Sequence, residues 1–198
     1  MIGKEFGVNA WIGVDTMLKM IPNFCTLLNL CCGMLAIVST FSYTKSAAVL
    51  LILFGMILDW LDGFAARKLH VTSVFGKTLD SLCDLVTFGI APAFLCYAVT
   101  LHHMFVFGIM LTGLFPICGA IQLARYNVQS GQTRGFIGMP ITFAGGLLSV
   151  VVLITSSLHA SVTAVVVLVL SWFMVSVIHF PSFNIQRYRI DEKRKAEL

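Results

Sequence analysis

Six long apolar segments constrain the fold of this chain more than any other feature. They cover roughly residues 24–43, 46–66, 79–101, 104–124, 138–157 and 162–180. A helix needs about 20 mostly apolar residues to cross a bilayer. Charged residues make up only 11% of the 198 residues, against about 25% in soluble domains. The sequence therefore predicts an all-α integral membrane protein with six transmembrane helices, whose short connections make consecutive helices antiparallel neighbours.

The residues before the first segment show a different pattern. Trp11, Val14, Leu18 and Ile21 recur at helical spacing, and charged residues lie between them. An apolar stripe beside a charged face is typical of a helix that lies in the membrane interface. We therefore expect an amphipathic interfacial helix over residues 1–21, with a frayed tail as the alternative.

The distribution of lysine and arginine predicts the orientation in the membrane. Twelve of the thirteen basic residues fall on the side that holds both termini, and only Lys45 falls on the other side. Cytoplasmic loops carry such an excess, so we expect both termini to be cytoplasmic and the protein to lie in the cell (inner) membrane. A basic tail at 182–198 follows the membrane domain at 22–181. We interpret its charge as an anchor to anionic membrane lipids, with no nucleic acid as partner.

Four of the nine acidic residues lie close together in the apolar sequence, namely Asp59, Asp62, Asp80 and Asp84. Charge inside a membrane segment is costly and usually marks a functional site. Spacings of three and four residues place the members of each pair on one helix face. Because the second and third segments are antiparallel, both pairs are expected at the same depth on the cytoplasmic side, where the four carboxylates converge.

Converging carboxylates repel one another and take up protons unless cations lie between them. Ligation by oxygen alone favours hard cations such as Mg²⁺ or Mn²⁺, and four carboxylates suit a two-metal site for phosphoryl displacement. Gly63 and Gly76 allow a ligand to approach the backbone closely. The Arg67 guanidinium and the Lys77 ammonium suit a diphosphate. The structural alternative is that the first two aspartates form helix caps or ion pairs with nearby basic residues.

One motif resembles the hallmark of the CDP-alcohol phosphotransferases: Asp59-x-x-Asp62-Gly63-x-x-Ala66-Arg67, eight residues, then Gly76-x-x-x-Asp80-x-x-x-Asp84. The resemblance implies a six-helix membrane enzyme that transfers a phospho-alcohol unit from a CDP-linked donor to a hydroxyl acceptor and releases CMP. It implies two divalent metal ions, Mg²⁺ or Mn²⁺, held by the four aspartates, with Asp84 as the catalytic base beside Asp80. Similar enzymes are often homodimers.

The predicted contacts of the CDP-linked lipid come from this motif and from the first segment. Thr26 and Asn29 lie three residues apart near the cytoplasmic end of that segment, and hydrogen bonding between helices is their alternative role. The complete predicted set is Thr26, Asn29, Asp62, Gly63, Ala66, Arg67, Gly76 and Lys77.

Longer stretches resemble the membrane-embedded phosphatidylserine synthases of this family, namely "IPNFCTLLNLCCGMLAI", "LDSLCDLVTFGIAPA" and "ARYNV…GFIGMPIT". The resemblance implies CDP-diacylglycerol as donor and L-serine as acceptor. Those enzymes often read Gly-x-Pro-x-Pro, and this chain departs from the pattern at the second proline, which is Thr142.

Four polar residues near the fourth and fifth segments are candidates for binding serine. An arginine fork suits a carboxylate, so Arg125 is the first candidate and Arg134 the second, while Gln122 and Asn127 are placed to read the amino group. The alternative for either arginine is a contact with lipid phosphate.

Two other functions compete with this interpretation. The first is the same chemistry with another acceptor, such as glycerol phosphate or inositol phosphate. The second is a divalent-cation transporter, which accounts for the aspartates but not for Gly63, Arg67 and Gly76 in register with them.

Overall fold

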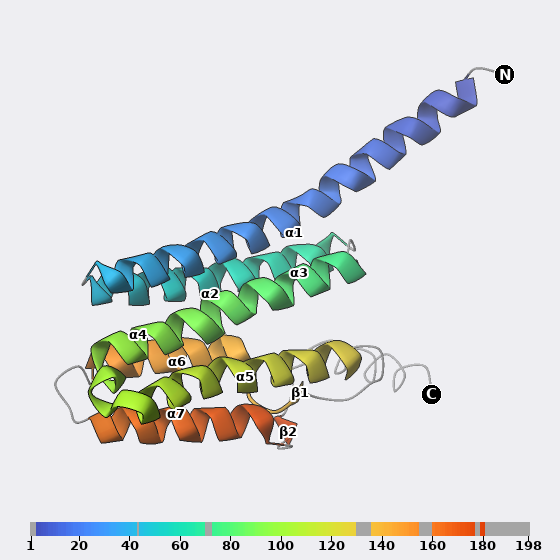
Figure 1. The fold of residues 1–198 in the computed structure, drawn as a ribbon. Coiled ribbons are helices and arrows are strands. Elements are labelled where there is room, and N and C mark those ends of the chain that lie inside the picture. The colour runs from blue at the N-terminus through green and yellow to red at the C-terminus, as the bar shows by residue number, and fades with distance from the viewer. Residues whose placement is uncertain are drawn as a thin grey trace, which may run out of the picture.

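The computed structural model describes residues 3–42, 44–69, 73–129, 136–154, 160–176 and 179–180. The helices are α1 (Gly3–Phe41), α2 (Lys45–Lys68), α3 (Val74–Asp84), a π-helical turn (Leu85–Ile90), α4 (Ala91–Val99), a 3-10 turn (Leu101–Met104), α5 (Phe105–Gln129), α6 (Ile141–Ile154) and α7 (Ala160–Val175). Figure 1 shows them lying lengthwise in one bundle, from which the amino-terminal part of α1 extends.

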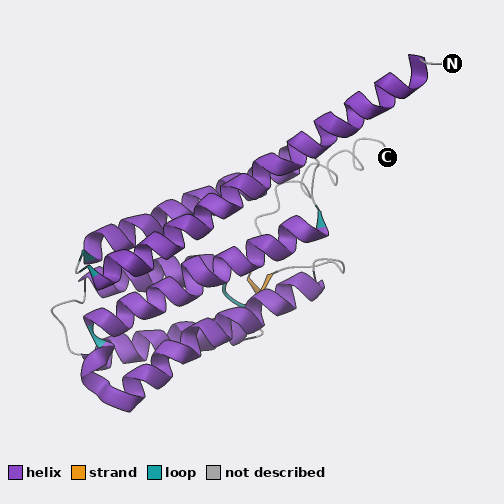
Figure 2. Cartoon of the chain, turned by 45° about the horizontal axis from the view of Figure 1, so that its top comes forward, coloured by secondary structure: helices purple, strands orange, loops and turns teal. Residues whose placement is uncertain are grey.

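The described part of the chain is almost entirely helical, as the sequence predicts (Figure 2). Its two strands, β1 (Phe136–Ile137) and β2 (His179–Phe180), are two residues long and pair antiparallel. This short pair joins the segment before α6 to the segment after α7, so it positions the start of α6 relative to the end of α7.

Four helices are long and apolar enough to cross a membrane: Pro22–Phe41, Lys45–Lys68, Val74–Val99 and Leu101–Val128. They correspond to the first four predicted segments. The last two segments contain α6 and α7, with 14 and 16 residues. At 1.5 Å per residue, α6 spans only about 21 Å, less than the roughly 30 Å of a bilayer core. The fold is therefore that of a membrane protein with four candidate spans, and a total of six stays a prediction.

The first helix runs without interruption from Gly3 to Phe41, with Pro22 inside it. The predicted interfacial segment at 1–21 is thus continuous with the first candidate span. Its location at the membrane surface stays a prediction, and the tail at 182–198 lies outside the described residues.

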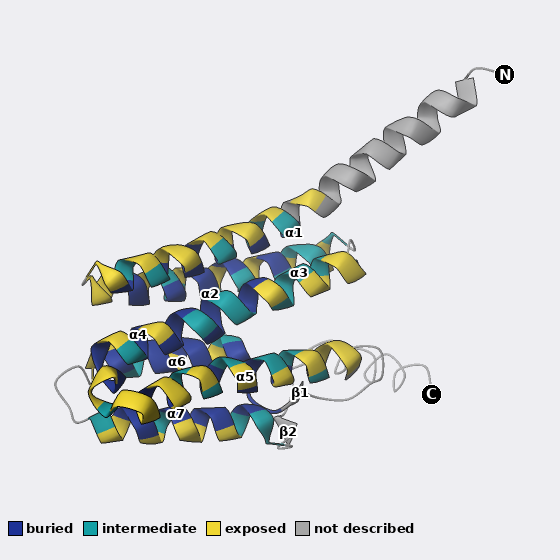
Figure 3. Ribbon diagram, in the orientation of Figure 1, coloured by how far each residue is buried: buried dark blue, intermediate teal, exposed yellow. Residues whose placement is uncertain are grey.

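Apolar side chains cover much of the outer surface of the bundle (Figure 3). Such a surface is unfavourable in water and is expected where lipid is the solvent. The third candidate span is the central one, because 61% of it is buried, against 28–33% of the other three. It is also the span that carries Asp80 and Asp84.

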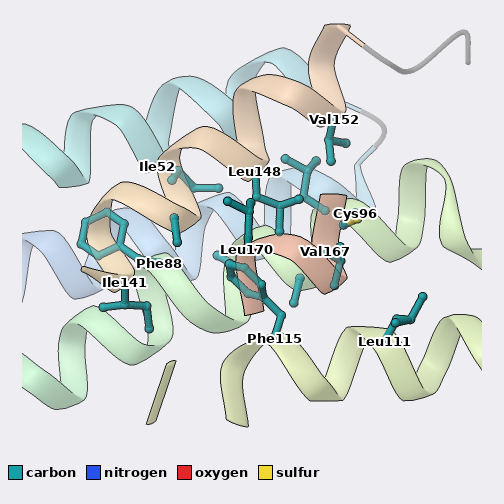
Figure 4. Packing of buried hydrophobic residues seen from close by; sticks show 14 of the residues in the cluster. Ile52, Phe88, Cys96, Leu111, Phe115, Ile141, Leu148, Val152, Val167 and Leu170 are labelled. Atoms are coloured by element: carbon teal, nitrogen blue, oxygen red, sulfur yellow. The ribbon is translucent and has the colours of Figure 1, made fainter. Parts of the chain in front are cut away.

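A π-helical turn bends the path of this central span directly after Asp84. In the turn, Phe88 is fully buried, and its carbonyl faces Gly145 of α6 so closely that a Cβ there would collide with it. Phe88 also lies in the apolar core with Ile141 and Leu148 of α6 (Figure 4). The glycine therefore allows α6 to lie directly against the turn that follows the catalytic candidates.

The substitution Gly145→Ala tests this close approach. We expect it to lower the free energy of unfolding by about 1–3 kcal/mol, because the added methyl group forces α6 away from the π-helical turn. Gly113→Ala on α5 is the matched control, since no atom lies within 4 Å of its added Cβ, and alanine favours a helix over glycine by about 0.5–1 kcal/mol. Thermal unfolding in detergent measures both, and equal stability of the two variants would contradict the packing argument.

Candidate active site

The four aspartates of the motif come from two helices. Asp59 and Asp62 lie on α2, and Asp80 and Asp84 lie on α3. Asp59, Asp62 and Asp80 each place one carboxylate oxygen within 4.8 Å of the others. Asp84 lies one turn beyond Asp80, is only 6% exposed, and lines the same cavity as the other three. Spacing along two antiparallel helices thus gathers a triad of carboxylates with a fourth beside it.

Hydrogen bonds from three other segments hold these carboxylates. Thr26 Oγ1 of α1 donates to Asp62 Oδ2 (2.8 Å), and Thr142 Oγ1 of α6 donates to Asp59 Oδ2 (3.3 Å). Both contacts join a neighbouring helix to α2. A side chain on the cluster is therefore fixed by packing between helices as well as by its own helix.

Asp84 is positioned by the fully buried Asn29, whose Nδ2 donates to Asp84 Oδ1 (3.1 Å). Asn29 is held in turn, because Thr87 Oγ1 of the π-helical turn donates to its backbone carbonyl (3.0 Å). The predicted donor contact Asn29 lines neither of the two cavities described below. In this structure it orients Asp84.

The chemistry of the cluster fits a divalent metal ion. Asp80 Oδ1 is buried without a hydrogen-bond partner, and in the described part of the chain no lysine or arginine forms a salt bridge with the four carboxylates. Buried carboxylates this close together are strongly unfavourable without a neutralising cation. A set of oxygen ligands suits Mg²⁺ or Mn²⁺, so Asp59, Asp62 and Asp80 can hold a metal ion.

A cavity of about 310 Å³ lies on one side of the cluster. Seven of the eight predicted donor contacts line it, namely Thr26, Asp62, Gly63, Ala66, Arg67, Gly76 and Lys77. Gly63 has a local reason to be glycine, because a Cβ there would lie 3.4 Å from the Arg67 guanidinium. Ser73 caps α3 by accepting a hydrogen bond from the Gly76 amide (2.9 Å). The sequence analysis did not include Ser73, although serine before a helix is a recognisable cap.

A second cavity, of about 330 Å³, lies next to the first. Its lining includes all four aspartates, Gln122 and Tyr126 of α5, and Pro140, Ile141 and Thr142 at the start of α6. The two cavities share five residues, which are Asp62, Gly63, Arg67, Asp80 and Tyr126. The carboxylates therefore lie where two ligands can meet.

The four predicted serine contacts have different locations. Gln122 lines the second cavity, and Asn127 lines the first and donates to Ser81 Oγ (2.9 Å). Arg125 lines neither cavity, and its Nη1 donates to the Val175 carbonyl at the end of α7 (2.7 Å). Arg134 lies outside the described residues.

Two residues at the second cavity were missed from the sequence. Tyr126 borders both cavities, and the only signal for it was its place between Arg125 and Asn127. Thr142 was noted only as a departure from a proline pattern. Its contact with Asp59 spans 83 positions along the chain, so nothing in the local sequence indicates it.

The model of one family, CDP-alcohol phosphatidyltransferase, matches residues 19–180. The chain belongs to this family. The matched region contains both cavities and the whole carboxylate cluster, so the geometry and the family lead to the same class of enzyme.

Curated relatives narrow the comparison. A CDP-diacylglycerol–serine O-phosphatidyltransferase of Bacillus subtilis (strain 168) is 42% identical over 167 residues, covering 84% of this chain and 93% of the relative. A protein of the same name from Helicobacter pylori (strain ATCC 700392 / 26695) is 34% identical, covering 84% and 74%. An archaetidylserine synthase of Methanothermobacter thermautotrophicus is 33% identical, covering 81% and 69%.

Metal binding should depend on the carboxylate cluster. We expect Asp80→Asn to weaken Mn²⁺ binding at least ten-fold, because it removes one charged oxygen ligand from the triad. Thr78→Ala on the same helix is the control, since the exposed Thr78 hydroxyl bonds only the Val74 carbonyl. Titration calorimetry of the purified protein measures both. Equal Mn²⁺ affinity in the two variants would show that the ion binds elsewhere.

Proposed function

We propose that this protein is a phosphatidylserine synthase, which transfers the phosphatidyl group of CDP-diacylglycerol to the hydroxyl of L-serine and releases CMP. The observation that carries the proposal is a carboxylate cluster shared by two adjoining cavities, one for each substrate. The names of the curated relatives supply the two substrates.

The first cavity suits the CDP part of the donor. Arg67 and Lys77 bring positive charge to its lining, and Gly63 and Gly76 keep the wall free of side chains. Guanidinium and ammonium groups are good partners for phosphate oxygens. The lipid chains of the donor remain in the cytoplasmic leaflet, where the apolar outer surface of the bundle meets the acyl region.

Serine enters the second cavity, and Asp84 accepts the proton of its hydroxyl. The resulting alkoxide attacks the lipid-bearing phosphorus, and the bond from that phosphorus to the CMP oxygen breaks. Asn29 keeps the Asp84 carboxylate turned toward the cavity. Two divalent ions at Asp59, Asp62, Asp80 and Asp84, either Mg²⁺ or Mn²⁺, neutralise the diphosphate when bound.

We further propose the arrangement in the membrane. Six spans within residues 22–181 place the aspartates, both termini and the basic tail on the cytoplasmic side, and residues 1–21 lie in the interface. The positive-inside distribution of lysine and arginine supports this orientation. The protein acts as a homodimer, as similar enzymes often do.

The direct test is release of CMP by the purified protein from CDP-diacylglycerol in the presence of Mg²⁺ or Mn²⁺. We expect release to require serine, and glycerol phosphate and inositol phosphate to be far poorer acceptors. Preference for one of these phosphates would move the protein to another acceptor class. Metal transport into vesicles without CMP release would favour the transporter.

The matched variant in this assay is Asp84→Asn. Loss of a general base lowers turnover by about 10²–10⁴-fold, while CDP-diacylglycerol binding should persist because Asp84 does not line the first cavity. Near-normal turnover would remove Asp84 from the role of base.

A further inference from the structure

The start of α6 faces the second cavity with unpaired amides. Pro140, Ile141 and Thr142 line this cavity. The first backbone hydrogen bond of the helix runs from the Ala144 amide to the Pro140 carbonyl (3.1 Å). The amides of Ile141, Thr142 and Phe143 precede it and have no acceptor within the helix. No other acceptor for them is found among the described residues.

Such a helix start favours an anion. Three free N–H groups and the positive end of the helix dipole act at the same point. The Thr142 side chain bonds Asp59, which places this helix start directly beside the carboxylate cluster. An anionic group bound here would lie within reach of the reacting centre.

Gln122 supplies an independent sign of a ligand in the same cavity. Its side chain is 95% buried, since only 5% is exposed, and its Oε1 has no hydrogen-bond partner. A buried carbonyl oxygen without a donor is costly, and an ammonium group would satisfy it. The cavity thus combines donors for an anion with an acceptor for a cation.

We infer that the second cavity binds an amino-acid zwitterion, with its carboxylate on the first turn of α6 and its ammonium on Gln122 Oε1. This inference rests on the proposed function and specifies the acceptor subsite. The β-hydroxyl of the bound amino acid then faces Asp84, which lines the same cavity. Arg125 takes a structural role, because it joins α5 to the end of α7 through the Val175 carbonyl.

The inference makes the recognition of the two charged groups separable. The experiment compares serine with 3-hydroxypropanoate, which lacks the ammonium group, and with ethanolamine, which lacks the carboxylate. Each is measured as a substrate in CMP release, or as a competitive inhibitor of serine where it is not turned over. The variants are Gln122→Leu, Arg125→Lys and Arg134→Lys. Thr112→Val is the control on α5, because its hydroxyl bonds only the Gly108 carbonyl.

We expect Gln122→Leu to raise the KM for serine and ethanolamine by about 10- to 100-fold, since a hydrogen bond to a charged group is lost. The constant for 3-hydroxypropanoate should stay unchanged. Arg125→Lys and Arg134→Lys should retain the wild-type preference for serine over ethanolamine, because neither side chain holds the carboxylate. Thr112→Val should match the wild type with all three compounds.

Two results would overturn the inference. An equal change for serine and 3-hydroxypropanoate in Gln122→Leu, or no change for either, would remove the ammonium from Gln122. Loss of the preference over ethanolamine in an arginine variant would move the carboxylate to that arginine. Absence of serine-dependent CMP release in the wild type is a different outcome, because it contradicts the proposed function itself.

Discussion

Electrostatic repulsion among carboxylates in an apolar bundle is the constraint on which the rest of this structure depends. Asp59, Asp62 and Asp80 place oxygens within 4.8 Å of one another, in a protein whose outer surface is suited to lipid. Removing such charges from water costs several kcal/mol per ion. An arrangement of this kind is stable only when cations or donors compensate it, and that requirement explains both the surrounding contacts and the fit to a divalent metal.

The helices around the cluster serve as its frame. Thr26 of α1, Asn29 of α1 and Thr142 of α6 each donate to a different aspartate. Gly145 lets α6 approach the π-helical turn that follows Asp84, and this approach sets the position of Thr142. Packing in the core and geometry at the site are therefore linked, so a change at a distant glycine is felt at Asp59.

Periodic patterns in the sequence predicted a large part of this arrangement. Apolar segment lengths gave the four longest helices, and the i,i+3 and i,i+4 spacings gave the convergence of two aspartate pairs, because both follow from the geometry of a single helix. The motif residues around Gly63, Arg67 and Gly76 indeed line one cavity. These features are local, and local features can be read from a sequence.

Contacts between distant segments could not be predicted in the same way. Asn29 was expected to bind the donor, but 55 positions along the chain separate it from its partner Asp84. Arg125 has the right charge for a carboxylate, yet the end of α7 provides its acceptor across 50 positions. Neither partner is visible in the spacing, because it depends on how the helices are arranged around one another.

The most direct test of the account is the location of the metal ion. Crystals of the full chain grown with Mn²⁺ give anomalous scattering that identifies the ion without reference to activity. The account predicts an anomalous peak between α2 and α3, coordinated by Asp59, Asp62 and Asp80. A fully ordered cluster without a peak, at Mn²⁺ concentrations that support CMP release, or a peak bound by other residues, would contradict it.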